Sequence, residues 1–139
     1  MTAKEYLEQP GRLKEEIQSD VDNLASLRSV VEKVTTSLSF TAGRGGKDPR
    51  SFENTMINIK AEEEKIWEKT EKLKLLMKEV MCLINQLPYG NKRRLLKMRY
   101  IEEKTWREIA AALEVGERYV YDLHRQALKD VEKRLQNRI

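Results

Sequence analysis

One stretch near the carboxyl end carries side chains that can form hydrogen bonds with the edges of DNA bases. Arg118 and Arg125 can each donate two hydrogen bonds to a guanine, and Glu117 and Asp122 can accept from a cytosine amino group. Tyr121 can pack on a thymine methyl group or donate its hydroxyl to a phosphate. The two acids have a second interpretation, since carboxylates near a helix N-terminus stabilise the helix dipole. The pattern predicts base reading in a major groove and leaves both roles of the acids open.

A second set of side chains lies ahead of this stretch and suits the phosphates of a duplex, which fix register without reading sequence. It consists of Lys92, Arg93, Arg94, Lys104, Thr105 and Arg107. Residues 88–139 carry 13 lysines and arginines against 8 acids, whereas the other 87 residues carry 14 against 15. The whole positive surplus of the chain therefore belongs to the segment that holds the candidate DNA-binding residues.

A short helix and, after a tight turn, a longer one must position these side chains. Thr105 and Glu108 have the spacing of a capping box, in which each side chain accepts a hydrogen bond from the other residue's backbone N–H. An apolar face follows and stops at residues 114–116, and a new helical run starts at Glu117. Helices joined by so short a turn cross steeply, as in a helix-turn-helix. The predicted buried positions are Ile109, Ala110, Leu113, Val120, Leu123, Ala127, Leu128 and Val131.

This segment resembles the promoter-binding region 4 of sigma-70 factors, which also ends small phage transcription regulators of Gram-positive hosts, such as the RinA and ArpU-like proteins. The resemblance rests on Leu95, Leu96, Met98, Arg99, Tyr100, Glu102, Glu103, the run Thr105-Trp106-Arg107-Glu108-Ile109-Ala110, Leu113, Glu114, Val115, Val120 and the run Arg125-Gln126-Ala127-Leu128. It implies a sequence-specific regulator of transcription that binds double-stranded DNA, is encoded by a phage or prophage, and can contact RNA polymerase. Glu114 departs from the family, because the turn position is usually glycine, and so do the acids Glu117 and Asp122.

The first 87 residues predict a helical arm. A short helix over residues 3–9 should break at Pro10-Gly11, and a long one should run from Arg12 to about Phe40. A glycine-rich loop over residues 41–50 follows; its spacing is poor for a phosphate-binding loop. Ser51 can cap a second long helix that ends near Leu87.

Both long helices have apolar residues spaced by three and four, so each needs a partner. The positions are Leu13, Ile17, Val21, Leu24, Leu27, Val31, Val34 and Leu38, then Phe52, Met56, Ile59, Ile66, Leu73, Leu76, Met77, Val80, Leu83, Ile84 and Leu87. An antiparallel hairpin or a dimer would satisfy them, and we expect a homodimer built partly on this arm. The expected fold is all-α, with a coiled-coil-like hairpin over residues 1–87 and a helix-turn-helix domain over residues 88–139.

Other classes of protein fit less well. The chain is 36% charged and has no apolar run long enough to span a membrane, so we expect no membrane association and a cytoplasmic location. Its one cysteine, Cys82, lies in an apolar run and should be a buried thiol. His124 is the sole histidine, expected at an exposed or rim position, so a histidine-based metal site is excluded. We expect that the protein is not an enzyme and that it binds no cofactor and no metal.

Two alternative functions remain open at this point. A small terminase-like DNA-packaging factor also combines a helix-turn-helix with a helical oligomerisation region, and would form a ring rather than a dimer. An adaptor or inhibitor that binds a host protein would use the same fold without DNA. The acidic Glu117 and Asp122 favour this second alternative.

Overall fold

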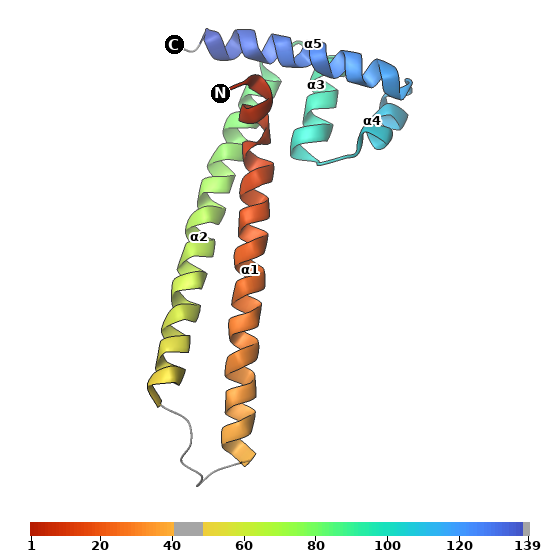
Figure 1. The fold of residues 1–139 in the computed structure, drawn as a ribbon. Coiled ribbons are helices and arrows are strands. Elements are labelled where there is room, and N and C mark those ends of the chain that lie inside the picture. The colour runs from red at the N-terminus through yellow and green to blue at the C-terminus, as the bar shows by residue number, and fades with distance from the viewer. Residues whose placement is uncertain (41–48, 138–139) are drawn as a thin grey trace. The chain divides into compact units, whose positions relative to one another are not determined.

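The computed structural model describes residues 1–40 and 49–137, and every regular element in these residues is helical (Figure 1). The elements are α1 (Ala3–Phe40), α2 (Pro49–Asn85), α3 (Asn91–Leu96), the π-helical η1 (Lys97–Ile101), α4 (Trp106–Leu113) and α5 (Glu117–Gln136). The all-α prediction is confirmed, as is a long N-terminal helix. Residues 41–48 of the predicted loop lie outside the described residues, and with them the candidate phosphate-binding spacing.

The chain divides into two compact units, which we describe one at a time. Unit 1 comprises Met1–Lys14 and Leu73–Ile139, and unit 2 comprises Glu15–Lys72. The predicted domain over residues 88–139 falls wholly within unit 1, which also takes in the start of α1 and the end of α2. The candidate functional residues therefore all belong to unit 1.

The core of unit 1 brings the carboxyl-terminal helices together with the start of α1 and the end of α2. Its fully buried side chains come from α1 (Leu7), α2 (Val80, Leu83, Ile84), α3 (Leu95, Leu96), α4 (Ile109) and α5 (Val120, Ala127, Val131). The predicted buried positions of α4 and α5 are confirmed, except that Leu128 is partly buried at the edge of the core. Burying a leucine or isoleucine side chain contributes about 1.5–3 kcal/mol, so this core supplies the main force that orients α5.

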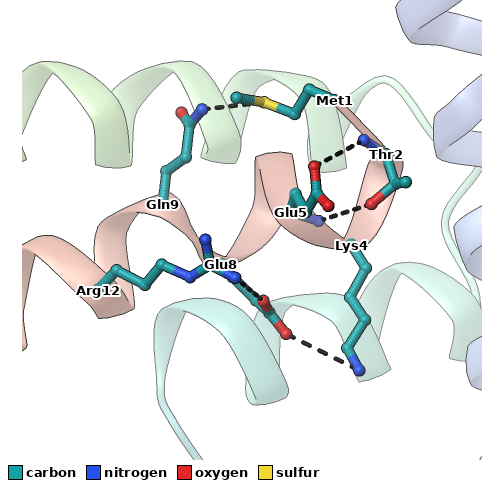
Figure 2. A network of polar contacts seen from close by, with 7 residues as sticks. All are labelled: Met1, Thr2, Lys4, Glu5, Glu8, Gln9 and Arg12. Carbon is teal, nitrogen blue, oxygen red and sulfur yellow. Dashed lines mark hydrogen bonds and ion pairs between the residues drawn. The ribbon is translucent and has the colours of Figure 1, made fainter.

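The start of α1 is fixed by a capping box that the sequence predictions missed. Glu5 donates its backbone N–H to Thr2 Oγ1 at 3.2 Å, and Thr2 donates its own to Glu5 Oε2 at 3.2 Å (Figure 2). Glu8 accepts from Arg12 at 3.1 Å and also lies 3.9 Å from Lys4. These contacts hold the first turns of α1 in helical form.

The predicted break at Pro10 is wrong, because α1 continues from Ala3 to Phe40 without interruption. Pro10 lacks the N–H that would bond to the carbonyl four residues earlier, which costs about 3 kcal/mol inside a helix. The Pro10 ring is fully buried in unit 1, one turn after the fully buried Leu7. Burial of these side chains offsets the missing hydrogen bond, so tertiary packing overrides the local preference of proline.

Two further predictions about α2 are corrected. The helix begins at Pro49 rather than after a Ser51 cap, in keeping with the preference of proline for a first helical position, where its missing N–H costs nothing. Cys82 is exposed rather than buried. It occupies the outward side of a helix whose inward side carries Val80, Leu83 and Ile84, so the apolar run around it misled the prediction.

Unit 2 pairs parts of α1 and α2 through ion pairs whose order along the two helices is antiparallel. Asp20, only 5% exposed, accepts from Lys69 at 2.8 Å, and Arg28 contacts Glu63 at 2.9 Å. The hydrogen bond from Lys69 lowers the pKa of Asp20. Of the predicted apolar positions, Leu24 and Ile59 are buried, whereas Val21, Phe52 and Met56 stay exposed.

Candidate functional site

The site is built around α4, whose first turn is fixed as the sequence predicted. Glu108 donates its backbone N–H to Thr105 Oγ1 at 3.2 Å, and Thr105 donates its own to Glu108 Oε1 at 3.4 Å. The Thr105 hydroxyl also donates to the same carboxylate at 3.0 Å. This capping box sets where α4 begins. Because its hydroxyl is occupied, Thr105 would have to break a local bond to reach the phosphate predicted for it.

The turn after α4 is a Schellman motif, which makes the link to α5 short and rigid. Val115 donates its N–H to the carbonyl of Ala110 at 3.0 Å, and Glu114 donates to Ala111 at 3.2 Å. Glu114 occupies the left-handed position of the motif, with φ 58° and ψ 43°. A side chain there costs about 1–2 kcal/mol relative to ordinary helical backbone. The departure from glycine therefore leaves the turn geometry intact and costs stability instead.

The outer side of α5 carries all five predicted base-reading residues, and each is exposed. These are Glu117, Arg118, Tyr121, Asp122 and Arg125, which we call the reading face. The opposite side of the helix is buried through Val120, Leu123, Ala127 and Val131. The amphipathic pattern of α5 thus decides which side chains remain free to meet a partner.

Ion pairs neutralise part of the reading face. Asp122 Oδ1 accepts from Arg125 Nη2 at 2.8 Å, one turn apart on the same helix. Glu117 lies 3.8 Å from Arg107, whose side chain is 91% exposed at the start of α4. Arg118 has no ion pair among the contacts resolved in the described residues. Arg118 can therefore contact a partner without first breaking an ion pair.

An aromatic cluster lies beside the reading face, and sequence reasoning did not assemble it. The Trp106 ring lies 5.5 Å from Tyr121 and 4.6 Å, edge-on, from His124, and the Arg99 guanidinium sits 4.3 Å above it. The Tyr100 hydroxyl lies 2.7 Å from His124 Nε2. Trp106 is itself partly buried against the core.

His124 occupies a rim position on α5, as expected, and packs against the rings of Tyr100 and Trp106. It is partly buried, and burial lowers the pKa of His124 to about 4, with smaller contributions from Lys4 and Arg99. Burial also raises the pKa of Tyr100 to about 12. At neutral pH the histidine is therefore uncharged, and its Nε2 forms a hydrogen bond with the Tyr100 hydroxyl.

The π-helical turn η1 brings Arg99 and Tyr100 into this cluster. Glu102 donates its N–H to the carbonyl of Lys97 at 3.0 Å, five residues back, and Lys104 donates to Met98 at 2.9 Å. Arg99 Nη1 donates to the carbonyl of Lys104 at 3.0 Å, which ties the turn to the start of α4. A π turn inserts an extra residue into a helix and so changes which side chains face its neighbours. Helical periodicity alone gives no signal of such an insertion.

The predicted phosphate contacts fall into separate groups. Arg93, Arg94 and Lys104 line a surface pocket of about 390 Å³ together with Lys97. Lys92 is instead paired with Asp130 of α5 at 3.0 Å, where it ties α3 to α5. Thr105 and Arg107 lie at the start of α4, next to the reading face. The structure thus brings three of the six into one basic pocket and gives Lys92 a structural partner.

Within residues 1–40 and 49–137, no cluster of three or more histidine, cysteine or acidic side chains could hold a metal ion. Among the helices described, none combines the length and apolar character needed to cross a membrane.

Comparison with known proteins identifies a family but not an activity. No curated protein and no solved structure matches the chain. A family model does match residues 33–132, a span that includes the end of α1, all of α2, α3, η1 and α4, and most of α5. Its description is a protein of unknown function, DUF1492. Because the match covers well over half of the chain, this protein belongs to the DUF1492 family.

Proposed function

We propose that the protein is a sequence-specific transcription regulator that binds double-stranded DNA through α4 and α5, acts in the cytoplasm and is encoded by a phage or prophage. The observation that carries this proposal is the reading face: Glu117, Arg118, Tyr121, Asp122 and Arg125 are all exposed on one side of a helix anchored by its other side. A helix of this kind fits the major groove and meets base edges with three or four side chains.

The turn supports the same interpretation. α4 and α5 are joined by residues 114–116 in a Schellman motif, and α4 starts at a capping box. A short, fixed turn between two packed helices is the geometry that a helix-turn-helix needs, with α5 as its recognition helix. The resemblance to sigma region 4 points to the same assignment. The phage origin rests on that resemblance alone.

Basic side chains of unit 1 outside the reading face would supply phosphate contacts. Arg107 projects at the start of α4, and Arg93, Arg94 and Lys104 surround a common pocket. Phosphate contacts release counterions, so the binding constant should fall steeply as salt is raised. Lys92 is paired with Asp130 and Lys104 with Glu102, so each would have to leave an acidic partner to reach a phosphate.

The decisive experiment selects bound fragments from the source genome with the full-length protein, then measures affinity for the selected site and for a scrambled duplex. Arg118→Ala should weaken the selected site by about 5- to 150-fold, since a bidentate base contact discriminates by roughly 1–3 kcal/mol. Binding to the scrambled duplex should change little. Equal loss on both duplexes would count against base reading by Arg118.

A second candidate function, a protein-binding adaptor or inhibitor, is favoured by the ion pairs on the reading face. With Arg125 held by Asp122 and Arg107 near Glu117, the face carries less free positive charge than its basic residues suggest. A surface of mixed charge with exposed tyrosines suits a protein partner as well. Absence of any salt-dependent DNA binding, together with capture of a host protein by the intact chain and not by Tyr121→Ala, would favour this candidate.

Self-association bears on both functions, and the sequence favours a dimer. Val21, Phe52 and Met56 of unit 2 remain exposed at positions of the predicted apolar stripes. Mass measurement in solution tests the prediction. A dimer agrees with the regulator, whereas a ring of about eight chains would favour the packaging alternative.

A further inference from the structure

Four aromatic rings connect the buried part of unit 1 to the reading face, and this connection carries an inference that rests on the proposed function. Tyr100 is only 9% exposed and belongs to η1, whereas Tyr121 is 47% exposed and belongs to the reading face. Between them lie His124 of α5 and Trp106 of α4, with ring centroids 5.9, 4.6 and 5.5 Å apart along the series. The series therefore touches three successive elements.

We infer that Tyr100 and His124 are positioning residues for DNA recognition, because their hydrogen bond fixes the rotation of α5 about its own axis and so sets where Tyr121 and Arg125 point. His124 lies at the border between the buried and exposed sides of α5. The Tyr100 hydroxyl holds it at 2.7 Å, a distance typical of a strong hydrogen bond. Apolar packing alone tolerates small rotations, because it is non-directional. The directional hydrogen bond between Tyr100 and His124, at the border of the buried side of α5, does not tolerate such rotations.

Trp106 passes this constraint on to the reading face. Its ring lies edge-on to His124 and against Tyr121, which is one turn earlier on α5. The Arg99 guanidinium covers the ring at 4.3 Å, and Arg99 is itself fixed by its hydrogen bond to the carbonyl of Lys104. Tyr121 thus has one side against a ring that cannot shift unless the Tyr100–His124 pair also shifts.

The groups around His124 come from α1, η1 and α4, and the charged ones come from α1 and η1. Lys4 and Glu8 approach from α1 and Arg99 from η1, and the Trp106 ring closes the α4 side. None of these charged groups forms an ion pair with the histidine in the contacts resolved among the described residues. The hydrogen bond with Tyr100 is consequently the directional contact on which the orientation of His124 depends.

The first test compares discrimination rather than affinity. Tyr100→Phe removes only the hydroxyl and keeps the ring in the core. We expect it to lower the ratio of affinities for selected and scrambled duplexes by about five- to tenfold, with scrambled-duplex affinity unchanged. Tyr119→Phe is the matched control, since Tyr119 is 51% exposed on the same helix and lies outside the four-ring series. An unchanged ratio in Tyr100→Phe, with the variant fully folded, overturns the inference.

Two substitutions of His124 separate the hydrogen bond from packing. His124→Phe keeps an aromatic ring but cannot form the hydrogen bond, so it should lose as much discrimination as Tyr100→Phe. His124→Gln keeps a side chain that can bond to the Tyr100 hydroxyl, so its loss of discrimination should be at most half of that in His124→Phe. The double variant Tyr100→Phe with His124→Phe should lose no more than either single variant, because both remove the same bond. Additive losses would contradict a shared role.

A DNA-independent readout keeps this inference distinguishable from the proposed function. In a Trp67→Phe background, Trp106 is the sole tryptophan, and quenching by iodide reports its exposure. Tyr100→Phe and His124→Phe should increase quenching, and Tyr119→Phe should not. If the wild-type chain binds no DNA but the quenching shifts as expected, the proposed function fails and the positioning of α5 stands. Unchanged quenching in both variants overturns the positioning itself.

Discussion

The carboxylate of Asp122 lies 2.8 Å from the guanidinium of Arg125, and both side chains are exposed on the reading face of α5. An exposed pair at this spacing contributes little to helix stability, about 0.3–0.5 kcal/mol. Its larger effect is on orientation, since a guanidinium held on one edge presents its other edge in a preferred direction. Asp122 carries a charge that opposes DNA binding, but it can therefore also orient Arg125, the basic side chain with which it pairs.

This relationship predicts opposite effects of Asp122→Asn on affinity and on specificity. Removing one negative charge near the phosphates should raise affinity for a scrambled duplex by severalfold. Freeing Arg125 from its partner should lower the ratio of the affinities for the selected and scrambled duplexes. Fluorescence anisotropy on both duplexes measures the two effects, and an unchanged melting temperature excludes a stability effect. A higher affinity ratio in Asp122→Asn would show that the ion pair hinders base reading by Arg125 and does not orient it.

The capping box predicts a specific loss of stability at α4. Thr105→Ala removes the acceptor for the Glu108 N–H at 3.2 Å, and loss of such a cap costs about 0.5–2 kcal/mol. Urea unfolding followed by circular dichroism gives the free energy. Thr105→Ser keeps the hydroxyl and should retain most of the stability; equal losses in the two variants would mean that the methyl group, not the cap, matters.

The left-handed residue in the turn predicts a stabilising substitution. Glu114 has φ 58°, a conformation that glycine adopts without steric cost, so Glu114→Gly should raise the free energy of unfolding by up to about 1 kcal/mol. Glu114→Ala removes the same charge but keeps a Cβ, and it should not stabilise the protein. Thermal unfolding of the two variants side by side distinguishes backbone relief from a charge effect.

The uncharged state of His124 predicts a pH dependence of stability. Burial lowers its pKa to about 4 in the folded chain, against about 6.5 when exposed. The unfolded chain therefore binds the proton more readily, so His124 lowers stability as pH falls from about 6.5 toward 4, with no further loss below that range. At roughly 1.4 kcal/mol per pKa unit the loss reaches at most about 3 kcal/mol.

Unfolding curves in urea at a series of pH values measure this loss. His124→Gln, which has no titrating group, should flatten the curve between pH 6.5 and 4. Other groups also destabilise the chain in acid, Asp20 among them, since its lowered pKa favours the ionised folded state. The difference between wild type and His124→Gln isolates the histidine, and identical curves would contradict the assignment.

The buried acid of unit 2 predicts that charge pairing sets how the two long helices align. Asp20 accepts from Lys69 at 2.8 Å and lies 3.4 Å from Lys65. Asp20→Asn should lower the urea midpoint, and Lys69→Met should do the same, because each removes the 2.8 Å ion pair and leaves only the longer contacts of Asp20 with Lys65 or of Lys69 with Glu16. Replacing both residues by apolar ones should recover stability but loosen the alignment. Crosslinking between engineered cysteines in a Cys82→Ser background measures the alignment.

The amino-acid sequence by itself determined that the chain is helical, where α4 and α5 begin, the capping box at Thr105 and the buried and exposed sides of α5, because these depend on local spacing and on the periodicity of apolar residues. It also placed a tight turn over residues 114–116, although the left-handed conformation of Glu114 is seen only in the structure. Only the tertiary structure decided that Pro10 stays helical, because its burial is a contact between distant segments. Tertiary packing also decided the partners of His124. The π turn brings Tyr100 into contact with His124, which lies 24 residues later in the sequence, and no pattern within either segment encodes this contact.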